Sequence, residues 1–251
     1  MVTRAELQRL RRLSVDRHAR DADGTFVLEG PVLLAEAIAA GTELETVFVE
    51  AGTDLPASFP ASVPVHTVVP GVLAKAADAV TSRGVAAIAR RPEHTLADVP
   101  AGTPVLVLAG VGDPGNAGTL LRTAEAAGFG AVLFAAGSAD PWSPKCVRSS
   151  AGSVLREMVI RGVEPLQLLE EVAATGRRRV GTRLSDAVAF TDADLPPDVA
   201  IVLGNEAHGL PAELDELVDD WVRIPMRGGV ESLNVAMAGT LLCYEVLRRH
   251  G

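Results

Sequence analysis

Near its C-terminus the chain reads Ile224-Pro225-Met226-Arg227-Gly228-Gly229-Val230-Glu231-Ser232-Leu233-Asn234-Val235-Ala236. In this stretch an apolar strand end passes through a glycine-bearing loop into the start of a helix. Two earlier segments have the same character, Gly204-Asn205-Glu206-Ala207-His208-Gly209-Leu210 and Asn116-Ala117-Gly118-Thr119-Leu120-Leu121-Arg122. Because α/β proteins keep their ligand sites where strands end in such loops, the three segments together predict a composite pocket.

The elements around these segments alternate between strand and helix. The run Val105-Leu106-Val107-Leu108 is continuously apolar, as expected of a strand buried on both faces of a parallel sheet. Hydrophobic periodicity then predicts strands at 131–135, 158–160, 179–182, 200–203 and 221–224, and helices at 116–127, 144–151, 165–174, 211–217 and 232–249. We therefore expect a parallel-sheet α/β domain.

A domain boundary is predicted where turn residues gather between Arg91 and Pro104. It separates a first domain, residues 1–92, from a second, residues 103–251. The first domain reads as a small α/β module of its own, with helices at about 4–14, 31–40 and 71–78 and strands at 25–29, 46–49, 65–68 and 85–89.

Composition places the chain among globular proteins. Its 251 residues are 48% hydrophobic, enough to bury a full core, and no apolar run approaches the roughly 20 residues of a membrane span. We expect a cytoplasmic protein without a membrane partner. Cys146 and Cys243 lie far apart and outside any Cys/His cluster, so neither a zinc site nor a disulfide framework is indicated, and both are expected to be buried.

The net charge of −9 is unevenly distributed along the chain. Residues 1–91 carry 10 Lys/Arg against 11 Asp/Glu, whereas residues 92–251 carry 13 against 21. The first 20 residues form a local exception, with six arginines against Glu6 and Asp16. This basic helix could contact phosphates, and a solvated helix explains it equally well.

One motif invites a different interpretation. Gly110-Val111-Gly112-Asp113-Pro114-Gly115 fits the G-x-G-x-x-G pattern of dinucleotide-binding proteins. In those proteins the third glycine lies within the helix and an acidic residue ends the next strand. Here we expect Asn116 to cap the helix, and the next strand leads into Gly137 and Ser138. An enzyme that binds a nicotinamide dinucleotide remains an alternative.

Three motifs carry a resemblance to a known family. The segments Asp113 to Ala124, Val202 to Leu210, and Ile224-Pro225-Met226 followed by Glu231 to Val235 resemble the three ordered motifs of the SpoU (TrmH) family of RNA ribose 2′-O-methyltransferases, within the SPOUT superfamily. The motif-bearing resemblance covers about residues 103–249. A weaker one, through Phe26-Val27-Leu28-Glu29-Gly30-Pro31, is to the ribosomal-protein-like domain that precedes the catalytic domain in many members.

The resemblance implies a fold, a cofactor, a substrate and an oligomeric state that the residues alone do not indicate. It implies a catalytic domain with a parallel sheet between layers of helices (α/β/α), whose chain forms a deep trefoil knot. A small α/β substrate-binding domain precedes it. It also implies S-adenosyl-L-methionine as cofactor, no metal, RNA as substrate with ribosomal RNA favoured over transfer RNA, and a homodimer formed through the catalytic domain. Knots are so rare that composition and periodicity would never indicate one.

The same resemblance assigns residues to roles. It implies that the cofactor is held mainly by backbone groups at Gly204, Asn205, Gly209, Ile224, Met226, Ser232 and Leu233. It implies catalytic or RNA-positioning roles for Asn116, Arg122, Glu206, Ser232 and Asn234. A guanidinium is effectively always protonated, so we expect Arg122 to position the target phosphate and 2′-oxygen rather than to act as a base. Glu206 is expected to orient Arg122 or the motif loops. Taken singly, Asn116, Ser232 and Asn234 are also explained as helix caps.

The sequence therefore predicts an S-adenosylmethionine-dependent 2′-O-methyltransferase acting on ribosomal or transfer RNA. A catalytically silent RNA-binding knot protein is the alternative from another class.

Overall fold

The computed structural model describes residues 2–76, 84–229 and 232–251. Val230 and Glu231 of the C-terminal motif, and the end of the helix expected at 71–78, lie outside the described residues. The chain divides into two compact units, one formed by Met1–Pro92 with Trp142–Arg156, the other by Glu93–Pro141 with Glu157–Gly251.

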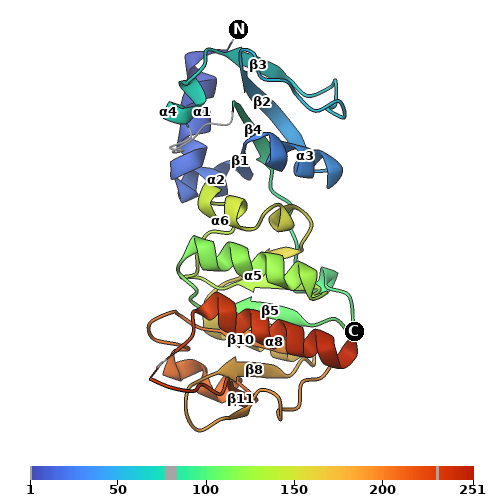
Figure 1. Cartoon of the computed structure of the whole chain (residues 1–251), viewed down its shortest axis with the longest axis vertical. Coiled ribbons are helices and arrows are strands. Elements are labelled where there is room, and N and C mark those ends of the chain that lie inside the picture. Colours follow the sequence, from blue (N-terminus) through green and yellow to red (C-terminus); the bar gives the residue numbers. More distant parts are fainter. Residues whose placement is uncertain (1, 77–83, 230–231) are drawn as a thin grey trace. The chain divides into compact units, whose positions relative to one another are not determined.

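The first unit is built on a four-stranded sheet of order β1-β4-β2-β3 (Figure 1). Strand β4 pairs antiparallel with β1 and β2, whereas β2 and β3 are parallel. The strands are β1 (Thr25–Glu29), β2 (Leu44–Glu50), β3 (Val65–Val68) and β4 (Val85–Arg90). The helical elements are α1 (Arg4–Val15), α2 (Arg17–Asp23), α3 (Pro31–Ala39), α4 (Val72–Ala76), α6 (Pro144–Ser149) and the 3₁₀ turn η2 (Ser153–Leu155).

Local signals explain where the first helices begin and end. Thr3 and Glu6 form a reciprocal capping box at the start of α1, which satisfies backbone N–H groups that the helix leaves unpaired. Helix α2 was not predicted from the sequence. It begins after Asp16, whose carboxylate accepts from the N–H of His18, and it ends at Gly24, which adopts a left-handed φ of 66°.

The segment 142–156 belongs to the first unit, although the sequence analysis included it in the second domain. Trp142 is fully buried and its ring lies 4.7 Å from that of Phe26. Arg148 donates to Glu29 at 2.5 Å, and Arg156 pairs with Glu36. These contacts join residues more than 100 positions apart, which local patterns cannot reveal.

The second unit is a seven-stranded, wholly parallel sheet of order β7-β6-β5-β10-β8-β11-β9. Its strands are β5 (Val105–Leu108), β6 (Ala131–Phe134), β7 (Val159–Arg161), β8 (Arg179–Thr182), β9 (Val188–Ala189), β10 (Ala200–Leu203) and β11 (Asp220–Arg223). Its helical elements are η1 (Leu96–Asp98), α5 (Pro114–Ala126), α7 (Pro165–Ala174), η3 (Ala212–Leu217) and α8 (Val235–His250). The parallel α/β fold expected from the sequence is confirmed, and the short edge strand β9 was not predicted.

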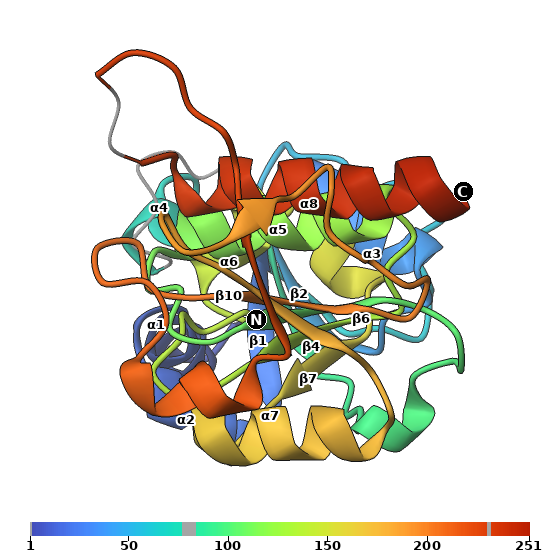
Figure 2. The same ribbon diagram turned by 90° about the horizontal axis from the view of Figure 1, so that it is seen from below.

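Helices cover both faces of this sheet. Figure 2 shows α5 and α8 along one face and α7 with η3 along the other. The central strands β5, β6 and β10 are buried throughout, which explains their continuous apolar sequences. Helix α8 lies close to its neighbours because Gly239 has no side chain: a Cβ there would come within 2.4 Å of Leu120 and 2.6 Å of Leu203.

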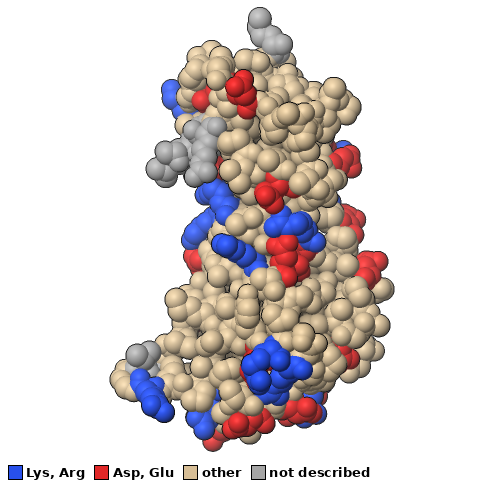
Figure 3. All heavy atoms as spheres, turned by 45° about the vertical axis from the view of Figure 1, so that its right-hand side comes forward, with Lys and Arg blue, Asp and Glu red and all other residues tan. Residues whose placement is uncertain are grey.

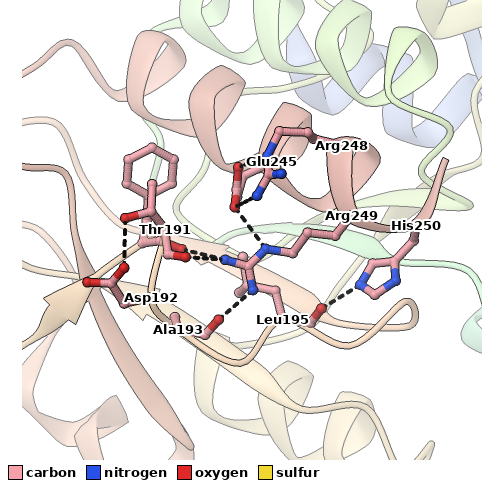
Figure 4. Close-up of polar contacts among 9 residues, drawn as sticks. Thr191, Asp192, Ala193, Leu195, Glu245, Arg248, Arg249 and His250 are labelled. Atoms are coloured by element: carbon pink, nitrogen blue, oxygen red, sulfur yellow. Dashed lines mark hydrogen bonds and ion pairs between the residues drawn. The ribbon is translucent and has the colours of Figure 1, made fainter.

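The last turn of α8 is anchored to the segment before β10 (Figure 4). Arg249 donates from Nε to Glu245 Oε1 at 2.8 Å and from Nη2 to the carbonyl of Thr191 at 2.7 Å. The His250 ring lies 2.6 Å from the carbonyl of Leu195. The polar contacts therefore fix the end of the helix to a loop some 55 residues earlier in the chain. Within the described residues, no helix is both long and apolar enough to cross a membrane.

Candidate functional site

The loops that carry the three motifs meet at one edge of the second unit's sheet. All the strands are parallel, so the segments after β5, β10, β8 and β11 leave from the same side. Strands β5 and β10 are hydrogen-bonded neighbours. The chain builds outward from them in opposite directions, to β6 and β7 on one side and to β8 and β11 on the other. Such a switch point leaves a crevice at the carboxyl ends of the strands.

The loop after β10 is folded back on itself. Asn205 and Gly209 exchange two backbone hydrogen bonds of 2.8 and 2.9 Å. Gly204 lies against this bridge so closely that a Cβ would be 2.2 Å from the carbonyl carbon of Gly209. The Asn205 amide donates to the carbonyl of Gly110 at 3.1 Å, which ties the loop to the one after β5. Glycine at 204 is therefore a steric requirement of this loop.

Glu206 projects from the same loop and binds the start of α5. Its carboxylate accepts from the backbone N–H groups of Gly112 and Asp113 and from the side-chain amide of Asn116, all at 3.0 Å. Partial burial alone would raise the pKa of Glu206, but these hydrogen bonds outweigh it and hold the pKa below its ordinary value. The carboxylate is thus ionised and fully engaged in joining two loops.

Asn116 extends this network to the third motif. Its side-chain oxygen accepts a hydrogen bond of 3.0 Å from the amide of Asn234. The oxygen of Asn234 in turn accepts from the N–H groups of Ala236 and Met237, so Asn234 caps α8. A continuous chain of hydrogen bonds, Asn234 to Asn116 to Glu206, therefore links all three motifs.

The start of α5 differs from the sequence-based expectation. Asp113, not Asn116, is the N-cap, and its carboxylate accepts from the N–H groups of Gly115 and Asn116. Gly115 consequently lies inside the first turn, as in a dinucleotide fold. Even so, the N–H groups that would hold a pyrophosphate there are already bound by the carboxylates of Asp113 and Glu206. The geometry disfavours the nicotinamide-dinucleotide alternative.

A cavity of about 610 Å³ opens beside this network. Its volume is within the usual range for small-molecule sites. All seven residues expected to hold a cofactor line it: Gly204, Asn205, Gly209, Ile224, Met226, Ser232 and Leu233. Two of the expected catalytic residues, Glu206 and Ser232, line it as well. Ser232 does not cap α8, because the helix begins three residues later, at Val235.

Arg122 is the one expected catalytic residue that the network does not include. It is exposed on α5, six residues beyond Asn116, which is about 9 Å along the helix axis. Among the described residues its side chain forms no hydrogen bond or ion pair, with Glu206 or with any other group. Within one chain Glu206 does not pair with Arg122, and its carboxylate instead accepts hydrogen bonds from the start of α5.

Several residues of the site escaped the sequence analysis. Thr182, Arg183 and Trp221 line the cavity from the neighbouring strands β8 and β11, and the Arg183 guanidinium lies 4.7 Å from the centre of the Trp221 ring. Ser138 accepts from the N–H of Gly110 at 2.9 Å and so holds the loop after β5. Position at the carboxyl end of a strand was the one available signal for Thr182 and Arg183.

The two cysteines and the metal-binding residue types do not form a further site among the described residues. Cys146 and Cys243 are both buried, as expected, and burial raises the pKa of the Cys243 thiol. In the part of the chain that the structure describes, no group of three or more His, Cys, Asp or Glu side chains could hold a metal ion.

Comparison with known proteins agrees with this geometry. Residues 103–244 match the SpoU rRNA Methylase family, and residues 5–87 match the MRM3-like substrate binding domain. The chain is 32% identical to the 23S rRNA (guanosine(2553)-2′-O)-methyltransferase RlmP of Bacillus subtilis, over 90% of each protein.

Solved structures of the same kind resemble the whole chain. The SpoU methyltransferase AviRb from Streptomyces viridochromogenes, in complex with AdoMet, is 26% identical and superimposes with a TM-score of 0.88 over 98% of both chains. The AdoMet-bound rRNA methyltransferase from Sinorhizobium meliloti is 28% identical with a TM-score of 0.88, covering 100% of this chain and 97% of that one. By sequence, by fold and by the motifs that meet at its site, this chain belongs to the SpoU rRNA methylase family.

Proposed function

We propose that this protein transfers a methyl group from S-adenosylmethionine to a ribose 2′-hydroxyl of RNA, with ribosomal RNA as the substrate. The observation that carries this proposal is the hydrogen-bonded chain Asn234–Asn116–Glu206 beside the cavity, since it joins all three family motifs at one place. RlmP, a relative of similar length, acts on 23S rRNA by its name, which favours ribosomal over transfer RNA.

The cavity suits the proposed cofactor. Ile224, Met226 and Leu233 provide an apolar lining for an adenine ring, and the folded loop at Gly204 and Gly209 brings main-chain groups to the cavity wall without intervening Cβ atoms. The cofactor would supply an activated methyl group on a sulfonium, so the protein has to position the acceptor oxygen in line with it. No metal is required for such a transfer.

The network gives each polar residue a distinct task. Glu206 is ionised and its acceptors are directed at the start of α5, so we assign it to positioning rather than to proton removal. Asn116 uses both ends of its amide within the network, whereas Asn234 uses its nitrogen there and its oxygen to cap α8. Both side chains are therefore held in fixed orientations, and we assign them to holding the loops around the RNA ribose. The hydroxyl proton passes to water or to a phosphate oxygen.

Arg122 is assigned to the substrate in a homodimer formed through the second unit. Its exposure and lack of partners among the described residues suit a group that binds phosphate or completes the site of a second copy. Helix α8 exposes Met237, Leu241 and Tyr244, with 64%, 43% and 47% of their surface accessible, and these side chains recur at helical spacing as an interface requires.

We further propose that the C-terminal segment forms the deep trefoil knot of the family and that the protein works in the cytoplasm, on RNA bound by its first domain. The return of the chain from β11, beyond β8, to place α8 against α5 and β10 supports a threaded path. Residues 1–92 and 103–251 are the proposed substrate-binding and catalytic domains.

The test is methyl transfer from labelled S-adenosylmethionine to protein-free ribosomal RNA and to transfer RNA, with a chelator present. We expect label in ribosomal RNA, at a ribose, as judged by resistance of the adjoining phosphodiester to alkali. Cofactor binding without any transfer would indicate the catalytically silent RNA-binding protein instead.

A second measurement examines Arg122. We expect Arg122→Ala to abolish transfer with nearly unchanged cofactor affinity, and Arg122→Lys to restore little activity because it lacks the planar fork that binds phosphate. Turnover near that of the unaltered protein in the alanine variant would remove Arg122 from the mechanism.

A further inference from the structure

The outer face of α1 carries a cluster of exposed cations. Arg4, Gln8, Arg11, Arg12 and Val15 are all exposed, and at about 100° per residue they fall within about 100° of the helix circumference. No exposed residue of α1 is acidic. The opposite side of the helix packs its leucines into the core of the first unit. We call Arg4, Gln8, Arg11 and Arg12 the α1 cationic face.

The other arginines near the N-terminus are engaged in the fold. Arg9 donates to Asp23 and to Glu45, each at 2.7 Å. Arg20 is only 4% exposed and donates to the carbonyl of Leu13 at 2.6 Å. Arg17 lies 3.9 Å from Asp21. Of the six arginines, three therefore make side-chain contacts within the first unit, and the three on the outer face of α1 do not.

The side chains of the three arginines of the α1 cationic face form no ion pair or hydrogen bond within the described residues. Arg4 is the first residue of α1, where the positive end of the helix dipole makes a cation unfavourable by roughly 0.3–1 kcal/mol. Arg11 and Arg12 add repulsion between like charges. Arg12 lies in the last turn of α1, where the dipole favours a cation. Within the described residues no acidic side chain pairs with Arg4, Arg11 or Arg12, so an anionic partner would offset the unfavourable terms.

We propose that the α1 cationic face binds the phosphate backbone of the RNA substrate, an inference that rests on the proposed function. The face extends about 12 Å along the helix from Arg4 to Arg12, at about 1.5 Å per residue. Successive phosphates of one nucleic-acid strand are only a few ångströms apart along the helix axis, so several lie within that reach. Arginine suits them because its fork can bind two phosphate oxygens at once.

The acidic net charge of the protein makes a local cationic surface important for binding a polyanion such as RNA. The net charge is −9, and in the view of Figure 3 most of the surface is neither basic nor acidic, while Lys and Arg side chains lie beside Asp and Glu at several places. A polyanion would gain little from such mixed surfaces. Unpaired arginines on one helix offer a place where phosphate contacts release counterions without first breaking an ion pair.

The experiment measures binding of protein-free ribosomal RNA by the full chain over a series of salt concentrations. For the triple variant Arg4→Gln, Arg11→Gln and Arg12→Gln, we expect affinity to fall at least tenfold at low salt. The slope of log K against log salt should become shallower by about 2–3, since each lost phosphate contact removes roughly 0.7–0.9. The matching triple lysine variant should keep most of the slope.

Paired single variants provide the control. Arg11→Gln should reduce the slope by roughly 0.7–0.9, whereas Arg90→Gln, in the same unit but paired with Glu45 at 2.8 Å, should leave it unchanged. The affinity for S-adenosylmethionine should stay at the value of the unaltered protein in every variant, and the thermal midpoint of the α1 glutamine variants should not fall. Unchanged RNA affinity in the triple glutamine variant, with the unaltered protein active, would overturn this inference alone. An unaltered protein that methylates no RNA would overturn the proposed function instead.

Discussion

Replacement of Gly204 by alanine tests whether the folded loop after β10 shapes the cavity. The added Cβ would lie 2.2 and 2.3 Å from the carbonyl carbon and oxygen of Gly209, and 2.4 Å from the nitrogen of Leu210. All three are backbone atoms, so no side chain can rotate away. Relief of the clash requires Gly209 to move, and this breaks the two hydrogen bonds that it shares with Asn205.

The expected cost follows from these contacts. Two hydrogen bonds contribute about 1 kcal/mol each, and overpacking of a tight site adds roughly 1–3 kcal/mol, so we expect a loss of about 3–5 kcal/mol in the free energy of unfolding. Displacement of the loop also moves one wall of the cavity. We expect the dissociation constant for S-adenosylmethionine to rise at least tenfold, which corresponds to about 1.4 kcal/mol.

Denaturant unfolding and calorimetric titration of the cofactor measure the two effects. Gly229→Ala is the matched control, because a Cβ there meets no atom within 4 Å and the residue has no left-handed φ. It should change the unfolding free energy by less than about 0.5 kcal/mol. If Gly204→Ala were as stable as this control and bound the cofactor normally, the steric argument for the loop would be refuted.

Three further results are expected. Glu206→Gln should lower methyl transfer at least tenfold and destabilise the protein by about 1–2 kcal/mol, because an amide NH₂ would face backbone N–H donors. Turnover and denaturant unfolding measure the two effects, and unchanged turnover would contradict the positioning role of Glu206. Gly239→Ala should cost about 1–3 kcal/mol in unfolding free energy, because its Cβ would press on leucines of α5 and β10; a neutral effect would show that α8 can shift freely. Arg248 and then Arg249 lower the pKa of Glu245 to about 2, so its carboxylate stabilises the fold above about pH 4.3 and that stabilisation is lost as pH falls toward 2. Arg248 is exposed, so solvent screens its contribution. Acid unfolding of Glu245→Gln should lack this part of the pH dependence.

Local patterns in the sequence were sufficient for most of the elements. Strands β5 and β10 were predicted with the bounds that the structure has, because both faces of a central parallel strand are buried and every residue is apolar. Helix α7 was equally clear from its periodicity. Helix starts were less certain: α5 begins at Pro114 and α8 at Val235, since several residues compete for each cap and only the surrounding contacts choose one.

The sequence likewise indicated some features of the candidate site and not others. The sequence placed Asn116, Glu206 and Asn234 in three loops, and their residue types indicated polar roles. It could not tell that these three side chains form one hydrogen-bonded chain, or that Arg122 stays outside it. Nor did it reveal Arg183 and Trp221 at the cavity, because neither belongs to a motif.

The sequence by itself thus determined the order of most of the strands and helices, the three motifs and the family. The tertiary structure alone decided which distant residues meet: Trp142 beside Phe26, Arg249 on the carbonyl of Thr191, and Glu206 across the start of α5. It also decided which of six similar arginines are left without partners. Periodicity and capping act over a few residues, whereas these pairings depend on strand order and on packing between segments about 60 to 120 positions apart.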